Sequence, residues 1–217
     1  MNHWLHILLI TLLLGGCVNS TVQQVRERET GIVEGQSVVI LGVSNRPSAT
    51  ETEVGFIDCV AGDLEQSSSE IRVIPMETFK DLTFPWFEPR TAPDKANQLP
   101  ALLAKPRLAA QLDKIGLRYL VWVDGRTRRT SSAGSIGCSI APGGGGCFGF
   151  LTWDEDASYE ATIWDTEDGR TAGRISSDAE GTSYMPALVV PIPIIARVQN
   201  NACKSLSDQL QAFLVNK

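Results

Sequence analysis

Short apolar runs alternate with helical stripes through the middle of the chain. The runs at 38–41 and 119–123 are continuously apolar, which is typical of strands covered on both faces, and 71–74 is also predicted to be a strand. Behind a Thr50/Glu53 capping box, a stripe at helical spacing follows the first run and consists of Val54, Ile57, Ala61 and Leu64. This pattern predicts a first strand–helix unit.

A second strand–helix unit is predicted between 71 and 116. A short helix at 76–82 precedes a proline-rich segment, 84–100, in which regular structure is not expected. Pro106 then begins a helix that Gly116 ends as a left-handed cap, and its apolar positions are Leu108, Leu112 and Ile115. The strand at 119–123 follows directly.

Strands alone are predicted after the glycine run at 143–146. Tyr159, Ala161 and Ile163 alternate with polar residues, and a polar strand follows a turn at Asp168 and Gly169, so this part forms a meander. The last segment has one apolar helical face, made of Val198, Ala202, Leu206, Leu210 and Phe213. We therefore expect an α/β (α+β) fold in which two βα units, a meander and a C-terminal helix share a single mixed sheet.

The start of the chain has the pattern of an export signal. Residues 5–14 are apolar and uncharged, and they are too few to span a bilayer. They end at Leu14-Gly15-Gly16-Cys17, which resembles the lipobox of bacterial lipoproteins. The resemblance implies a signal peptide at 1–16, lipid attachment at Cys17 and, because Val18 follows in place of Asp, an outer-membrane location. The polar residues at 17–36 predict a flexible tether, and 37–217 a single domain.

Charge and histidine content exclude several classes of function. The net charge is −6, so there is no basic surface for nucleic acid. Both histidines, His3 and His6, lie in the predicted signal peptide, which excludes histidine-dependent catalysis and histidine metal sites in the mature chain. The glycine run lacks the Gly-Lys-Ser/Thr of a nucleotide-binding loop. We expect no metal, no cofactor and no nucleotide.

Four cysteines remain besides Cys17, an even number that suits an oxidising compartment. Cys138 and Cys147 flank a flexible glycine-rich turn, so we expect them to form a disulfide. Cys59 and Cys203 lie on the flanks of the two predicted helices and would form the second. The rival interpretation, a redox or metal role, has neither a Cys-x-x-Cys motif nor a histidine to support it.

An aromatic segment, 84–90, is the main candidate for a binding surface. Phe84, Trp86, Phe87 and Arg90 are residue types favoured at interfaces, and the prolines between them keep the backbone irregular. The alternative is a lid whose rings plug one end of the sheet, although we expect at least one of Trp86 and Phe87 to be displayed. The apolar residues at 188–195 predict a buried crossover or, less favoured, an exposed patch. Phe148 and Phe150 could likewise be presented by the glycine-rich loop.

The order of elements resembles the α/β amino-terminal domain of the Tol-system translocation protein and related periplasmic lipoproteins, including the curli-secretion lipoprotein. The similar residues are Gly116-Leu117-Arg118-Tyr119-Leu120-Val121-Trp122-Val123-Asp124-Gly125 and Ala161-Thr162-Ile163-Trp164-Asp165. They describe a strand and a hairpin and include no catalytic residue, so the resemblance implies a fold and a role in the envelope.

These observations favour a non-catalytic, lipid-anchored periplasmic protein that binds another envelope component, with the bilayer contacted through acylated Cys17 and an envelope protein as partner. Two alternatives stay open. One is a module that binds glycan, peptidoglycan or a small ligand. The other is an acidic hydrolase that uses a carboxylate pair such as Glu160 with Asp165 or Asp124 with Glu88.

Overall fold

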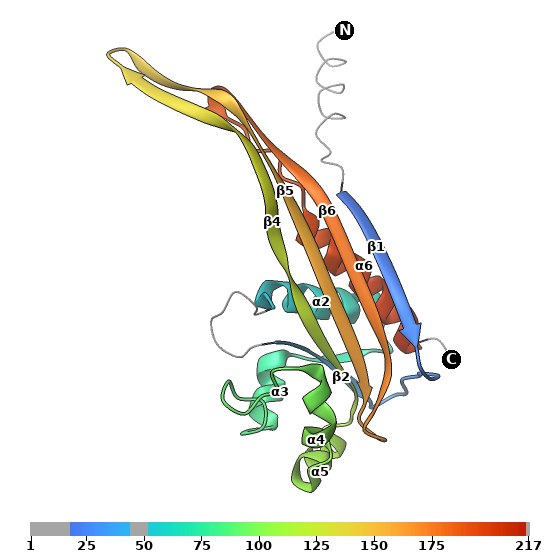
Figure 1. Cartoon of the computed structure of the whole chain (residues 1–217). Helices are drawn as coiled ribbons and strands as arrows, with labels where there is room; N and C mark the ends of the chain where they lie inside the picture. The colour runs from blue at the N-terminus through green and yellow to red at the C-terminus, as the bar shows by residue number, and fades with distance from the viewer. Residues whose placement is uncertain (1–17, 44–51, 216–217) are drawn as a thin grey trace.

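One mixed sheet of six strands organises the molecule (Figure 1), as the sequence predicts. The computed structural model describes residues 18–43 and 52–215, and the strands lie in the order β1-β6-β5-β4-β2-β3. In chain order the elements are β1 (Val18–Arg26), β2 (Ser37–Gly42), α2 (Val54–Ser67), β3 (Arg72–Ile74), α3 (Met76–Leu82), the 3-10 turn η1 (Ala96–Gln98), α4 (Leu99–Leu103), α5 (Pro106–Lys114), β4 (Leu117–Ala141), β5 (Gly144–Asp165), β6 (Arg170–Pro191) and α6 (Val198–Val215).

Helices cover both faces of the sheet at one end of the molecule. Helices α2 and α6 pack on one face over residues such as Val121 and Ile163, while α3, α4 and α5 pack on the other over Leu120 and Trp122. Strand β2 is parallel to β3 and β4, and the other pairs are antiparallel. Alternate residues of one strand therefore enter two different cores, which explains the continuous apolar runs.

The predicted tether is wrong for residues 18–26. This segment is β1, and it pairs antiparallel with β6 from Val18 opposite Gly181 to Arg26 opposite Gly173. Val18 and Val22 pack against the core under α6, while most of the other side chains are exposed. A polar segment can close a sheet edge because the pairing is made by backbone groups, which composition does not report.

The four predicted helices are present as α2, α3, α5 and α6, and they differ in detail. A fifth, α4, begins at Leu99, so the expectation of no regular structure over 84–100 is wrong at its end, where Pro100 fits the first turn of a helix. Helix α6 buries the predicted face, and α5 ends at Gly116, whose φ is +68°. In α2 the buried residues are Phe56, Ile57, Val60 and Leu64, whereas Val54 is exposed, so the predicted stripe is rotated around the helix. Thr50, proposed as a cap, lies outside the described residues, and Glu53 makes no side-chain cap.

Strands β4, β5 and β6 are much longer than the sequence pattern indicates. Each has at least 22 residues, and all three continue past the helices as a narrow ribbon that leans away from the body. Gly134 permits this continuation, since its φ is +90°. A Cβ atom at this position would lie 2.1 Å from the Phe150 carbonyl oxygen. The close approach of the two backbones therefore requires a residue without a side chain.

Candidate functional site

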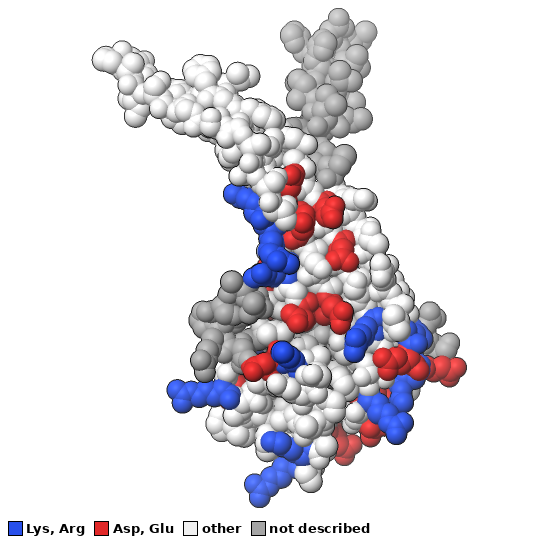
Figure 2. Space-filling view, viewed as in Figure 1, with Lys and Arg blue, Asp and Glu red and all other residues white. Residues whose placement is uncertain are grey.

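The ribbon, residues 130–154 and 182–195, is the most unusual surface of the protein, and we call it the arm. Most of its large apolar side chains face solvent, with Trp153 as a buried exception: Ile140 is 93% exposed, Leu188 81%, Phe148 63% and Val190 63%. The arm carries no charged residue except Asp154 at its base. In Figure 2 it is accordingly white, in contrast to the body. Soluble monomers rarely expose apolar surface of this extent unless it contacts something else.

Two features hold the arm in shape. The Cys138–Cys147 disulfide joins β4 to β5 at directly opposite residues, as the sequence predicts, just before the turn at the tip. On the other side, β6 pairs with β5 as far as Val189 opposite Cys147. The predicted buried crossover at 188–195 is therefore wrong. These residues form an outer strand and its continuation, where no helix covers them, whereas Phe148 and Phe150 are exposed as the alternative had it.

At the base of the arm one row of residues runs across four strands. Arg129 of β4 lies opposite Glu155 of β5, Glu155 opposite Gly181 of β6, and Gly181 opposite Val18 of β1. The charges of the body end at this row. The first described residue of the chain, Val18, lies at the same level.

The sheet face that α3 to α5 leave uncovered is strongly charged (Figure 2). Arg128, Asp156 and Glu180 follow one another across β4, β5 and β6, and Ser158 donates a 2.6 Å hydrogen bond to Asp178 on the same face. These residues line an open groove of about 490 Å³. Nearby, hydrogen bonds from Ser131 and Thr182 lower the pKa of Asp154. Arg128 and Asp156 are opposite charges on neighbouring strands, whereas Asp156 and Glu180 are like charges, so this face is polar with an excess of carboxylates.

The proposed carboxylate pair of a hydrolase, Glu160 with Asp165, is not brought together. Both residues belong to β5, and five residues along a strand correspond to about 16 Å. Glycosidase carboxylates lie roughly 5–9.5 Å apart, so this pair cannot act as acid and base on one bond.

The aromatic segment is divided between core and surface. Phe87 is 3% exposed and packs against Phe79 with ring centroids 4.9 Å apart, so its ring belongs to the core under α3. Trp86 is half-buried beneath the Lys105 ammonium, which lies 4.6 Å from the ring centroid. Phe84 is 69% exposed, and Arg90 is also exposed. Phe84 and Arg90 are therefore available for contact, whereas Phe87 is excluded as a binding residue because it is buried.

A partly buried polar cluster that the sequence does not indicate lies where α2, β4, β5 and α6 meet. The Tyr159 hydroxyl donates to the Glu53 carboxylate at 3.0 Å and lies 2.9 Å from the Thr127 hydroxyl, while Gln199 donates to it at 3.3 Å. Burial raises the pKa of Tyr159 to about 12. The Tyr159 ring also stacks on Phe56. Every member has a partner within the protein, so the cluster fixes the helices to the sheet.

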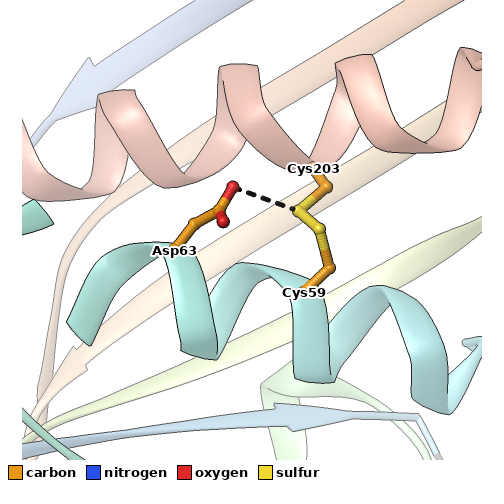
Figure 3. A group of neighbouring side chains, drawn as sticks. All are labelled: Cys59, Asp63 and Cys203. Carbon is orange, nitrogen blue, oxygen red and sulfur yellow. Dashed lines mark hydrogen bonds between the residues drawn. A yellow bond between two sulfur atoms is a disulfide. The ribbon is translucent and has the colours of Figure 1, made fainter. Parts of the chain in front are cut away.

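The second disulfide joins α2 to α6 beside an acidic residue (Figure 3). Cys59 is bonded to Cys203, and the Asp63 carboxylate lies 3.8 Å from the Cys203 sulfur. These three residues are close enough to hold a metal ion in principle. A metal requires free thiolates, however, and both sulfurs are used in the disulfide. In this oxidised form the group is a covalent link between the helices.

The proposed lipidation site, Cys17, and the predicted signal peptide lie outside the described residues. Between 18 and 215, the described helices include none that is long and apolar enough to cross a membrane.

Comparison with known proteins gives similarity only at the level of solved structures. No protein-family profile and no curated protein sequence matches the chain. Two structures of the PelC dodecamer from Paraburkholderia phytofirmans, one of them a substituted form, are each 11% identical over 92% and 91% of this chain and all of the PelC chain, with TM-scores of 0.41 and 0.42. Lipoprotein GNA1162 from Neisseria meningitidis is 13% identical over 67% of this chain and 83% of its own, with a TM-score of 0.35. These partial similarities assign no function.

Proposed function

We propose that the chain is a non-catalytic lipoprotein, attached to the periplasmic face of the outer membrane through acylated Cys17, that acts by binding another component of the envelope. The sequence Leu14-Gly15-Gly16-Cys17 supports the attachment. The two disulfides support a location in an oxidising compartment, because structural disulfides persist there.

The single observation that carries the binding role is the exposed arm. Its exposed apolar side chains, such as Ile140, Phe148 and Leu188, belong to neither core cluster, whereas Trp153 and Ala187 in the arm are buried. Ordering a long, exposed ribbon costs conformational entropy, and the hydrophobic surface it displays is stabilised only when something else covers it. Contact with a further envelope component supplies that cover.

A glycan ligand receives less support. Sugars commonly stack on aromatic rings, but the residues that line the groove on the open sheet face are Arg126, Arg128, Arg129, Thr130, Asp156, Ala157, Ser158, Asp178 and Glu180. This charged surface is better matched to a protein with complementary charges. Phe84 and Arg90, at the opposite end of the body from the arm, remain a second proposed contact.

Attachment is tested by replacing Cys17. We expect the native protein to carry acyl groups on Cys17 by intact mass, and the Cys17→Ser variant to lose that modification and to leave the membrane fraction. An unmodified Cys17 in the native protein contradicts the anchor.

Binding is tested by photocrosslinking in intact cells. A photoreactive amino acid at Leu188 in the arm is compared with the same amino acid at Val54, which is 55% exposed on α2. We expect an adduct with an envelope component from position 188 and much less from position 54. Equal, weak labelling from both positions contradicts a binding role for the arm.

A further inference from the structure

We infer that the arm lies in the interfacial layer of the lipid bilayer beside the acylated residue and orients the domain on the membrane. This inference rests on the proposed lipid anchor and names the envelope component that the arm contacts. The carrying observation is the row Val18, Gly181, Glu155 and Arg129, because it relates the arm to the point where the chain would leave the membrane.

The residue that follows the proposed anchor lies at the base of the arm. Cys17 is bonded to Val18, and consecutive Cα atoms are about 3.8 Å apart, so a lipid on Cys17 is attached next to the row. Val18 is fixed there by pairing with Gly181. Since no flexible linker separates Val18 from the sheet, acyl chains on Cys17 keep the bilayer within a short distance of the residues that follow Gly181. Those residues are the arm.

Charged residues are present on the body side of this row and absent from most of the arm side. On the body side of the row lie Arg126, Arg128 and Asp156, which require water or headgroups. On the arm side, past Asp154, neither 131–153 nor 182–195 contains any Asp, Glu, Lys or Arg. The exposed side chains there include Ile140, Phe148, Leu188 and Val190. A surface that is uncharged from the anchor outward matches the apolar side of a membrane interface.

The residues near the row are types that favour the headgroup layer. Arg129 is exposed, and its guanidinium lies 5.1 Å from the centre of the Trp153 ring. Tyr184 lies on β6, three residues beyond Gly181 toward the tip, and is partly exposed beside Phe150. The Trp153 ring is 7% exposed and is covered by the protein, so the exposed Arg129 and Tyr184 are the residues here that combine an apolar body with a polar end, as side chains in the headgroup layer do.

The backbone of the arm limits how deeply it enters. In the arm β4 and β6 extend beyond their partners β2 and β1, so β4 has no strand partner among the described residues on its outer side. The outer edge of β6 bonds to the returning segment 192–194 at Tyr184 and Pro186 and, within 18–43 and 52–215, has no strand partner beyond Pro186. Unpaired backbone groups are not tolerated in hydrocarbon, but headgroups and interfacial water satisfy them. From the row to the tip the arm extends roughly 35 Å, at about 3.3 Å per residue. We therefore place it obliquely along the interface, with its apolar side chains just below the headgroups.

The position of the arm is tested with an added tryptophan and brominated lipids. Full-length acylated protein is reconstituted into vesicles of phosphatidylethanolamine and phosphatidylglycerol, with bromine at a shallow or a deep acyl position. The reporter is Phe148→Trp. The matched control is Phe84→Trp, since Phe84 is similarly exposed, at 69% against 63%, but lies beyond α3 at the far end of the body. The signal is the fluorescence that each variant adds to that of the parent protein.

We expect shallow bromine to reduce the added fluorescence of Phe148→Trp by about twofold or more, with deep bromine less effective, as for a side chain buried 5–10 Å into the interface. The added fluorescence of Phe84→Trp should not change. Equal fluorescence of Phe148→Trp with and without bromine, in protein bound to vesicles, overturns the inference and leaves the anchor intact.

Two further readouts separate this inference from the proposed function. If intact mass shows Cys17 unmodified, the anchor fails, and the quenching measured on the same protein mixed with vesicles still decides whether the arm enters the interface. If the photoreactive amino acid at Leu188 forms an adduct with a protein and none with lipid, the arm binds a protein partner. In that case the inference is wrong while the binding role stands.

Discussion

Replacing Phe87 distinguishes a structural role of the aromatic segment from a binding role. Its ring is 3% exposed, contacts Phe79 and lies among leucines of α4 and α5. Phe87→Ala removes this ring from a closed core. Core Phe→Ala substitutions cost about 3–5 kcal/mol, from the lost transfer free energy of the ring and from the cavity left behind.

The expected loss is large enough to measure directly. For a domain of this size, each kcal/mol lowers Tm by about 2–4 °C, so we expect Phe87→Ala to lower Tm by roughly 10–15 °C. Thermal unfolding followed by circular dichroism and urea unfolding both report it. The control is Phe84→Ala, three residues earlier and exposed, which we expect to change stability by less than about 0.5 kcal/mol.

Either of two results contradicts the assignment of Phe87 to the core and Phe84 to the surface. If Phe87→Ala unfolds within 2 or 3 °C of the parent protein, roughly 1 kcal/mol, the ring does not contribute to the core as its burial indicates. If Phe84→Ala is the less stable of the two, the assignment of the segment to core and surface is reversed.

Three further predictions concern the Cys59–Cys203 disulfide, the close approach of two backbones at Gly134 and the ionisation of Tyr159. Removing the Cys59–Cys203 link with a double Ser variant should lower the free energy of unfolding by about 5 kcal/mol on the loop-entropy model, measured by urea unfolding, because the cysteines are 144 residues apart. Gly134→Ala should increase amide exchange in the arm and leave the body protected, because the added Cβ meets a backbone oxygen. The pKa of Tyr159 is about 12 in the folded state and 10.0 ordinarily, so stability should be unaffected below pH 10 and fall as pH rises from 10 to 12. Tyr159→Phe should show a smaller fall over that range in pH-dependent unfolding.

Much of the body follows from local sequence. The apolar runs at 38–41 and 119–123 became central strands because their side chains enter cores on both faces, and 71–74 became the edge strand β3 beside them. The apolar face of α6 and the cap at Gly116 are likewise local properties. The two cysteine pairings also follow from local sequence, because one pair flanks a hairpin turn and the other lies on the flanks of two helices.

The sequence was least informative where backbone pairing decides the structure. Nothing in the polar composition of 18–26 indicates a strand, because β1 is formed by the free edge of β6, which lies more than 140 residues away in sequence. In the aromatic segment, the sequence likewise could not predict which side chains are buried. Its prolines exclude regular structure but do not determine which ring the core under α3 receives, and Phe87 rather than Phe84 fills that space.

The sequence by itself predicted the export signal and determined most element types of the body and the residues that could be bonded or buried, since these depend on neighbours along the chain. Only the tertiary structure decided that the apolar residues at 188–195 are displayed and that they begin beside Val18. Both outcomes depend on which strands pair and on where the helices stop covering them. Hydrophobicity makes a residue available for burial, but whether it is buried depends on the surfaces that the rest of the fold brings to it.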